Sequence, residues 1–305
     1  MRIHSIYVLV LAMIGLIGPS APLAADTTVI KLAVVMPEGS TWTNTIHQYA
    51  AAVKKQTGGQ VAVKVYAGGI CGDEADVLRK MRVNRIHAAG FSGVGLGIVL
   101  PEIRILEAPL LCGSYAEVDH LKEQLYDHFA AGFEKKGYVL LGFAEAGFVY
   151  LFSEKDMTRP GGLDAVKMWA WKGDPVAETF LANFGIRTFP LNVTDVNTGL
   201  ETGMIDSFYA PPLAAVAFQW YARIKYMLDC PMVNSTGALL IKKSVFDRLS
   251  AENQQILRTL TRNYCGELVR LTRRDNHEAM QVLRETGTPQ SGSDLIGPRP
   301  NLAAA

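Results

Sequence analysis

The fold is decided by the stretch from Leu163 to Pro211, which begins Leu163-Asp-Ala-Val-Lys-Met-Trp-Ala-Trp171 and ends Gly203-Met-Ile-Asp-Ser-Phe-Tyr-Ala-Pro211. Alternating apolar residues and helical periodicity follow each other along it, which predicts strand, helix, strand, helix and strand. Trp169 and Trp171 stand two apart on the first of these strands, and such residues point to the same side. The two indoles are therefore candidates for the wall of a ligand cleft.

The N-terminal half has the same alternation of patterns. Strands are expected at Val29–Val35, Val61–Tyr66 and Ile86–Ser92, and helices at Thr43–Thr57 and Asp73–Val83. Strands that alternate with helices indicate an α/β fold with largely parallel sheets, which bind ligands beyond the carboxyl ends of their strands. Separate strands are expected at Tyr138–Ala144 and Gly147–Phe152.

The C-terminal part predicts one long helix from Ala251 to Glu285, with Ser250 as its N-cap. At about 1.5 Å per residue, such a helix is roughly 50 Å long, enough to brace two domains. We expect domain I to comprise residues 26–147, completed by about 236–250. Domain II is expected at 148–235, completed by parts of the 251–287 helix. The Gly-, Pro- and Ser-rich tail 288–305 is expected to be disordered.

Length and composition fit two domains, and the N-terminal pattern fits export. The chain has 305 residues, 49% of them hydrophobic, and a net charge of +1. Without a long basic run it lacks the charge pattern of nucleic-acid-binding proteins. Arg2, the short apolar run Ile6–Ile17 and the small-residue stretch Pro19–Ala25 resemble a signal peptide, residues 1–25, with cleavage near Ala25. A membrane anchor is the alternative, since the match to a cleavage site is loose.

Chemistry-bearing residues give no catalytic pattern. Among the six histidines only His120 and His128, eight apart on one helix face, have a spacing that a metal could use, and they lack a third ligand. No Gly-x-Ser-x-Gly is present. Gly93, Gly95 and Gly97 lack the spacing of a dinucleotide fingerprint and are expected in a close turn beneath a cleft. We expect neither an enzyme nor a metal or cofactor. The four cysteines allow three disulfide pairings or buried free thiols, and the sequence does not choose between them: Cys71, Cys112, Cys230 and Cys265.

A series of motifs resembles one family along roughly Ile30 to Gly287. The chain is similar to the substrate-binding (DctP-type) subunits of tripartite ATP-independent periplasmic (TRAP) transporters. The matching segments are Val35-Met-Pro-Glu-Gly-Ser-Thr-Trp42, Gly58–Tyr66, Gly68-Gly69, Asp73-Glu74, Val77–Ala89, Gly137–Gly142, Gly147-Phe148, Phe152-Ser153, Leu163–Met168, Gly199–Asp206 and Leu249–Leu257.

The resemblance implies a periplasmic two-domain binding protein without catalytic activity. Its ligand cleft lies between hinged domains, and a long helix spans both. It captures a small organic solute and delivers it to integral-membrane permease subunits. We expect a monomer.

The chain departs from the family where the resemblance places polar ligand anchors. Trp169 stands where most members have a carboxylate-binding arginine, Val149 replaces a second arginine, and Ala210 replaces an asparagine. A buried carboxylate without a charged partner is costly, whereas aromatic walls favour apolar surface. We therefore expect a largely hydrophobic ligand. A carrier of lipid- or sterol-like molecules, a solute sensor without a permease, and a carboxylate binder with a non-standard anchor are the alternatives.

The candidate ligand-binding residues are mainly aromatic. Each also has a packing interpretation, and Glu145 would suit a cationic or hydroxyl-bearing ligand. Lys172 is expected in solvent or in a salt bridge with Asp174, and Arg187 on the surface. The candidates are Trp169, Trp171, Phe148, Tyr150, Tyr209, Trp42, Phe91, Ser92 and Glu145.

Overall fold

The computed structural model describes residues 27–157, 161–285 and 290–291. The expected signal peptide at 1–25 lies outside the described residues. So does the expected tail at 288–305, except for the short strand β9 (Gln290–Ser291), which pairs in parallel with β8. Among the described residues, no helix combines the length and apolarity needed to cross a bilayer.

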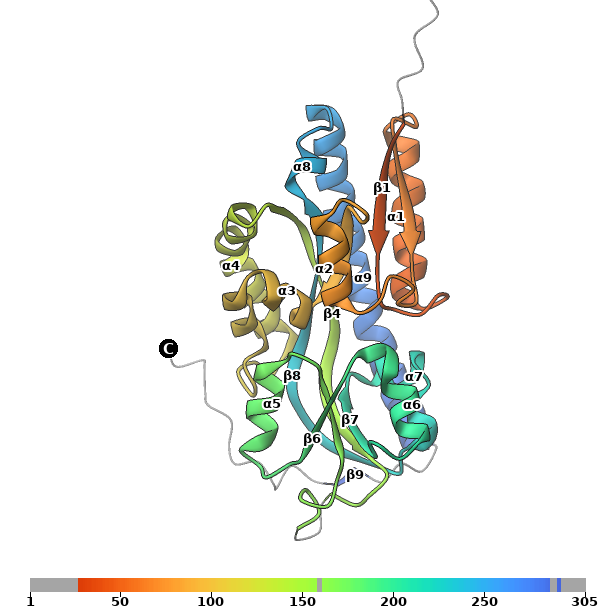
Figure 1. The fold of residues 1–305 in the computed structure, drawn as a ribbon, viewed down its shortest axis with the longest axis vertical. Helices are drawn as coiled ribbons and strands as arrows, with labels where there is room; N and C mark the ends of the chain where they lie inside the picture. Colours follow the sequence, from red (N-terminus) through yellow and green to blue (C-terminus); the bar gives the residue numbers. More distant parts are fainter. Residues whose placement is uncertain (1–26, 158–160, 286–289, 292–305) are drawn as a thin grey trace, which may run out of the picture.

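Domain I, the upper half of the molecule in Figure 1, starts with three parallel strands in the order β2-β1-β3. Three of its helices begin at a side-chain N-cap. Ser40 caps α1, and Asp73 and Ser114 form capping boxes at α2 and α4. Apolar clusters fill both faces of this part of the sheet. The elements are β1 (Thr28–Ala33), α1 (Thr41–Gln56), β2 (Val61–Tyr66), α2 (Glu74–Arg82), β3 (Ala88–Ser92), α3 (Gly93–Val99), the 3-10 helix η1 (Pro101–Glu107) and α4 (Tyr115–Lys135).

Two long antiparallel strands run through both domains. They are β4 (Tyr138–Ser153) and β8 (Tyr226–Lys242), and they join all strands into one sheet of order β2-β1-β3-β8-β4-β7-β5-β6. The expectation of two strands at Tyr138–Ala144 and Gly147–Phe152 was therefore wrong. Glycine suggested a break, but Gly147 sits in a register irregularity within one strand, at φ +108°. The sheet is also mixed rather than largely parallel.

Domain II contains the predicted succession of strands and helices. Its strands β5, β6 and β7 are mutually parallel, and β7 pairs antiparallel with β4. The elements are β5 (Met168–Trp171), α5 (Pro175–Ala182), β6 (Thr188–Leu191), η2 (Val193–Asp195), α6 (Val196–Glu201), β7 (Ser207–Ala210), α7 (Pro212–Ala217) and η3 (Trp220–Arg223).

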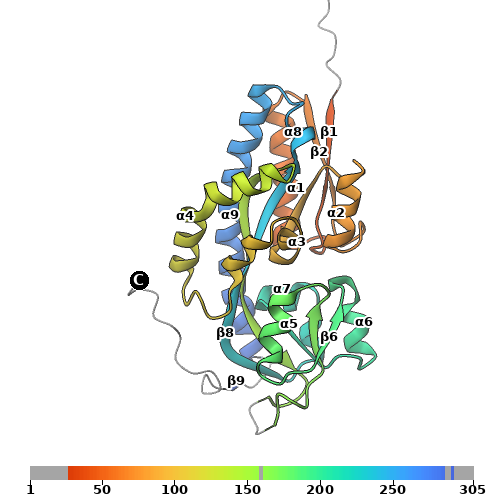
Figure 2. The same ribbon diagram turned by 60° about the vertical axis from the view of Figure 1, so that its left-hand side comes forward.

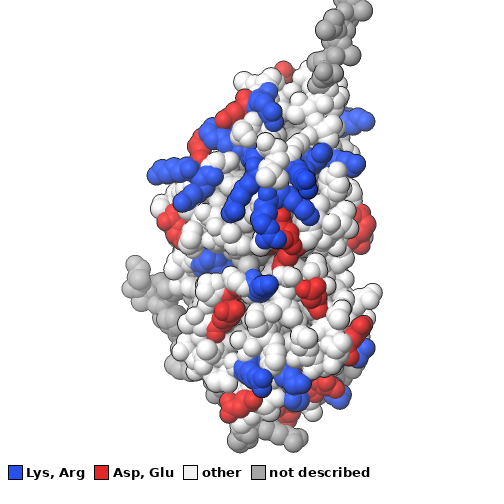
Figure 3. All heavy atoms as spheres, in the orientation of Figure 1, with Lys and Arg blue, Asp and Glu red and all other residues white. Residues whose placement is uncertain are grey.

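The last long helix, α9 (Ala251–Glu285), follows α8 (Lys243–Phe246) and has the predicted bounds. The Ser250 hydroxyl accepts the backbone N–H of Asn253 at 3.2 Å, as expected of an N-cap. In Figures 1 and 2, α9 passes beside α1 in domain I and reaches α7 in domain II. On the face shown in Figure 3, Lys and Arg gather over domain I, whereas both signs mix over domain II.

Candidate functional site

A cavity of about 90 Å³ lies between the two domains, and we call it the cleft. Domain I contributes the end of β3, the start of α3 and the 3-10 helix η1, while domain II contributes β5, α5 and β7. The long strands β4 and β8 complete the lining. The lining residues are Ser92, Val94, Arg104, Glu107, Pro109, Val149, Leu151, Trp171, Asp174, Val176, Ala177, Phe180, Leu181, Tyr209, Met232, Val233 and Ser235.

An ion cluster joins the domains in the cleft. Arg104 of η1 donates through Nη2 to Oδ1 of Asp174, at 2.6 Å. Its Nη1 lies 2.8 Å from Oε2 of Glu107, and its Nε is buried without a hydrogen-bond partner among the described residues. Burial favours the neutral guanidine, but the two carboxylates outweigh it and raise the pKa of Arg104. Arg104 is therefore charged, and it is shared between two acids.

The acids of the cluster differ in their surroundings. Burial raises the pKa of Glu107, although Arg104 opposes the shift, and the backbone N–H of Thr236 donates to Oε1 of Glu107 at 2.7 Å. Asp174 also caps α5, because its Oδ1 accepts from the N–H groups of Val176 and Ala177. One guanidinium thus meets two carboxylates, so the cluster carries no surplus positive charge when both are ionised.

Tyr209 connects β7 to this cluster. Its hydroxyl accepts the backbone N–H of Trp171 at 3.1 Å and lies 3.5 Å from Oδ2 of Asp174. Burial, followed by the charge of Asp174, strongly raises the pKa of this phenol. The hydroxyl is therefore neutral and serves as a hydrogen-bonding group at the polar end of the cleft.

A second bond between the domains comes from Trp171. Its Nε1 donates to Oδ2 of Asp73 at 2.9 Å, and Asp73 is the residue that caps α2. An aromatic side chain of domain II is thereby fixed against domain I. Together with the Arg104–Asp174 pair, this bond holds the domains in contact around the cleft.

Glu74 holds Ser92 in place at the edge of the cleft. Its buried carboxylate accepts the N–H and hydroxyl of Ser92, at 2.7 and 2.8 Å, and the N–H of Gly95 at 2.7 Å. Burial raises the pKa of Glu74 to about 7. A Cβ at Gly95 would lie 2.5 Å from this carboxylate, so the position requires glycine. Gly93, Gly95 and Gly97 belong to helix α3, and the expected turn is absent there.

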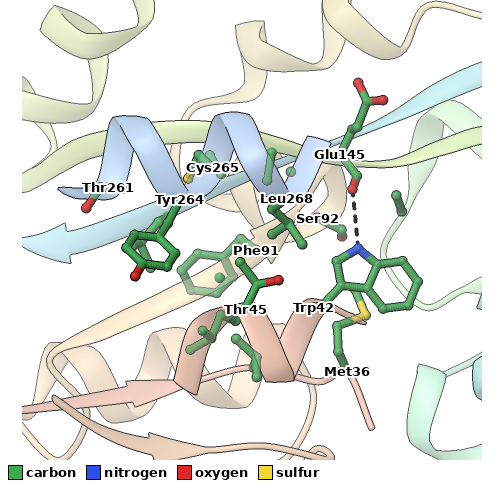
Figure 4. A pocket seen from close by; sticks show the side chains of 18 of the residues that line it. Met36, Trp42, Thr45, Phe91, Ser92, Glu145, Thr261, Tyr264, Cys265 and Leu268 are labelled. Carbon is green, nitrogen blue, oxygen red and sulfur yellow. Dashed lines mark hydrogen bonds between the residues drawn. The ribbon is translucent and has the colours of Figure 1, made fainter. Parts of the chain in front are cut away.

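A second cavity, of about 100 Å³, lies inside domain I between the sheet and helices α1 and α9, and we call it the hollow (Figure 4). Trp42 stands at one end, where its Nε1 donates to the backbone oxygen of Glu145 at 3.4 Å. Ser92 and Ser235 line both the hollow and the cleft.

The structure distributes the predicted site residues over several places. Ser92, Trp171 and Tyr209 line the cleft. Trp42, Phe91, Ser92 and Glu145 line the hollow. Phe148 and Tyr150 lie in a third groove beside α9, where Phe148 packs on Tyr115 with ring centroids 4.9 Å apart.

Trp169 lies in the core of domain II and is 2% exposed. Its ring stacks on Tyr209 at 5.1 Å and meets Trp220 edge-on at 5.3 Å. Its Nε1 donates to the backbone oxygen of Leu191 at 3.0 Å. In this conformation its contacts are those of a packing residue, and it supports Tyr209 from behind.

The carboxylate of Glu145 points away from the hollow (Figure 4). It receives Nζ of Lys122 at 3.1 Å and Nε of Arg273 at 2.7 Å. Burial lowers the pKa of Lys122 against the pull of Glu145, whereas Asp119 and Glu145 outweigh burial and raise the pKa of Arg273. Glu145 thus joins β4, α4 and α9 where the chain passes between the domains.

Sequence reasoning missed Arg104, Glu107 and Asp73 as site residues. Arg104 is the single cation within a mainly apolar run, with Glu102 two residues before it and Glu107 three residues after it, and that isolated cation was the available signal. Asp174 pairs with Arg104 across the cleft, while Lys172 is exposed. All four cysteines are free thiols. Within the described ranges, no three His, Cys, Asp or Glu side chains gather as a metal site requires.

Comparisons with known proteins agree with this architecture. The family model for bacterial extracellular solute-binding protein, family 7 (DctP), matches residues 32–293. A solute-binding protein of Verminephrobacter eiseniae is 27% identical over 235 residues, which cover 76% of this chain and 70% of that protein.

Solved structures are similar as well. A TRAP periplasmic solute-binding protein of Citrobacter koseri with bound D-glucuronate has a TM-score of 0.79 and 25% identity, covering 87% of this chain and 89% of that one. The galactonate complex of DctPAm from Advenella mimigardefordensis shares the fold, with a TM-score of 0.82, 18% identity and coverage of 88% and 87%. The chain therefore belongs to the bacterial extracellular solute-binding proteins of family 7, the DctP family of TRAP-type binding proteins, and is not an enzyme.

Proposed function

We propose that this protein captures a small organic solute in the cleft between its domains, in the periplasm, and delivers it to integral-membrane TRAP permease subunits. The family supports the role, and the N-terminal residues 1–25 support export. The observation that carries the choice of site is that both domains line one cavity and bond to each other across it, through Arg104–Asp174 and Trp171–Asp73.

The proposed ligand has a largely apolar body and one polar group. Most side chains of the cleft are aliphatic or aromatic, and Glu107, Asp174 and Tyr209 gather around Arg104. Removing apolar surface from water contributes about 25 cal/mol per Å². Asp174 and Glu107 already share the guanidinium, so a hydroxyl or amine that donates to them suits the cluster as it stands.

An organic acid anchored by Arg104 is the second candidate, and two observations favour it. The Citrobacter koseri and Advenella mimigardefordensis proteins hold sugar acids. In this chain, Arg104 belongs to domain I and Asp174 to domain II, so opening the cleft would release the guanidinium from Asp174. A ligand carboxylate would then form the planar, two-point pair that suits arginine.

A matched set of probes separates these candidates. Cyclohexylmethanol, cyclohexylmethylamine and cyclohexanecarboxylate share one ring and differ in the polar group, and D-glucuronate replaces the apolar body by hydroxyls. Calorimetric titration of the mature protein should show saturable binding of the alcohol or amine. Tighter binding of the carboxylate establishes Arg104 as the anchor of an acid. Binding of D-glucuronate alone would overturn the apolar body.

Two further measurements test capture and export. Native mass spectrometry of protein purified without denaturation identifies a ligand that stays bound. The N-terminal sequence of protein from the periplasmic fraction should begin near residue 26. Arg104→Met should weaken the binding of cyclohexanecarboxylate, which needs the guanidinium, and strengthen that of the cationic cyclohexylmethylamine, because Glu107 and Asp174 are then free to accept from it. Arg79→Met, at the exposed pair with Asp76, should leave both unchanged.

A further inference from the structure

The hollow of domain I exists because the sheet carries small side chains where helices face it. Gly90 of β3, Gly237 of β8, and Ala144 and Ala146 of β4 form the sheet wall. Gly237 lies opposite both Ser92 and Ala144 in the neighbouring strands. Large side chains of α1 and α9 face this wall, among them Trp42 and Leu268, and they leave about 100 Å³ unfilled.

Most polar groups around the hollow are already bonded within the protein. The Thr45 hydroxyl donates to the backbone oxygen of Thr41 at 2.8 Å, and the Thr261 hydroxyl donates to Tyr49 at 3.1 Å. Only the Thr236 hydroxyl, among the buried side-chain atoms of the described lining, has no partner. A bound water needs two to four polar partners, so this space suits apolar atoms better than water.

The hollow meets the cleft at two serines. Ser92 ends β3 and is held by Glu74, and Ser235 lies opposite Gly147 on β4. Both residues line both cavities. The two cavities therefore adjoin at these serines, which makes this the place where one molecule could occupy both.

We propose that the hollow is a subsite for the apolar end of the ligand, and that it takes an aromatic ring or a branched alkyl group of roughly six carbons. The inference rests on the proposed function, because the polar group of the same molecule lies in the cleft. The volume sets this size as an upper limit, since apolar protein cavities of roughly 150 Å³ bind benzene and the hollow has about 100 Å³. The proposed ligand is thus a molecule with a ring or branched alkyl group at one end, for the hollow, and one polar group at the other end, for the cleft.

Benzene tests the hollow without requiring the natural ligand. In ¹H–¹⁵N NMR spectra of the mature protein, saturable shifts are expected at the amides of Gly90 and Gly237. Ala144→Ile adds three carbons to the sheet wall with a side chain that suits strands. It should weaken benzene binding at least tenfold. Ala62→Ile adds the same atoms to the edge strand β2, outside the hollow, and should leave binding unchanged.

A smaller change guards against poor folding of the isoleucine variant. Gly237→Ala places a Cβ 3.3 Å from the backbone oxygen of Phe91, which is tight but tolerable after a small shift. It should weaken benzene binding by a smaller factor. Circular dichroism melting verifies that each variant folds. Unsaturable shifts, or equal affinity in wild type, Ala144→Ile and Gly237→Ala, overturn the subsite.

Titration with 4-phenyl-1-butanol separates the subsite from the cleft. Its hydroxyl suits the cluster and its ring suits the hollow, so Ala144→Ile should weaken it tenfold while leaving cyclohexylmethanol within twofold. Equal loss or equal retention for both alcohols overturns the subsite and leaves the proposed function intact. If wild type binds neither alcohol nor the other cleft probes, while benzene binding still responds to Ala144→Ile, the proposed function fails and the apolar cavity site stands.

Discussion

Arg104 and Asp174 lie on opposite domains, and Nη2 of the arginine is 2.6 Å from Oδ1 of the aspartate. Asp174 is buried and Arg104 is largely so, with 5% and 13% of their side chains exposed. Glu107 shares the same guanidinium from domain I. The contact between the domains therefore depends on a cation that has two anionic neighbours and little water.

Removing this cation should destabilise the protein. Arg104→Met leaves Glu107 and Asp174 buried without their partner, and breaking a buried pair in this way costs about 3–5 kcal/mol. Urea denaturation measures the change in the free energy of unfolding. The double variant Arg104→Met/Asp174→Asn should lose less of the free energy of unfolding than Arg104→Met alone. A loss below 1 kcal/mol, as expected of the exposed Arg79–Asp76 pair, would contradict a buried cluster.

The two tryptophans should respond differently to the same change. Trp171→Phe removes the bond to Asp73 across the cleft, so the ligand-free protein should open and its radius of gyration by X-ray scattering should rise. Trp169→Phe removes a bond to Leu191 within domain II, so it should lower the melting temperature without opening the cleft. Each lost bond should cost about 1 kcal/mol. Equal scattering curves for the two variants would contradict these assignments.

Glu145→Gln tests whether this acid supports the structure or contacts ligand. The change leaves Lys122 buried beside an uncharged amide, and it should destabilise the protein by about 3–5 kcal/mol. Asp119→Asn is the matched control, because Asp119 pairs with the same Arg273 at the surface and should cost under about 1 kcal/mol. Weaker binding of the cleft probes at unchanged stability would instead make Glu145 a ligand contact.

Glu74 should give the stability a specific pH dependence. Its pKa is raised from 4.5 to about 7 by burial, so the folded state holds this proton more tightly than the unfolded state. The resulting stability is full below pH 4.5 and is lost as pH rises through about 7. Its size is on the order of 3 kcal/mol, since each pKa unit is worth about 1.4 kcal/mol.

Glu74→Gln removes that titration. The difference in unfolding free energy, wild type minus variant, should fall between pH 4.5 and pH 8, measured by urea denaturation. Glu201→Gln, at an exposed carboxylate of α6, is the control and should give a difference that barely changes over the same range. A constant difference for Glu74→Gln would show that the carboxylate does not titrate there.

Local patterns were sufficient for elements whose signals lie within one segment. The bounds of α9 followed from a capping serine and a long apolar period, and β2 from strict alternation. The domain II strands and helices were predicted for the same reason. Strand β4 was not, because Gly147 looked like a terminus, whereas it allows Asn276 of α9 to approach: a Cβ there would lie 2.3 Å from Nδ2 of Asn276.

The site was harder to predict because its contacts join distant segments. Arg104 and Asp174 are 70 residues apart, and only the folded domains bring them together. Alternation correctly placed Trp169 and Trp171 near each other, with ring centroids 5.9 Å apart. It did not reveal that Trp220 covers Trp169, while Trp171 at the end of β5 faces domain I. The hollow could not be predicted from the sequence either, since it arises from small residues on three separate strands.

The unbroken strands β4 and β8 make the connection between the domains an elastic one. Rotating two domains about a flexible loop requires little free energy, whereas bending a hydrogen-bonded sheet requires more. A sheet bends most easily where its hydrogen-bond ladder is irregular. The ladder between β4 and β8 has three such places, and the one from Glu145 to Gly147 lies beside the Arg273 ion pairs and Asn276 of α9. Gly147 and Asn276, which do not line the cleft, therefore contribute to the force constant for opening.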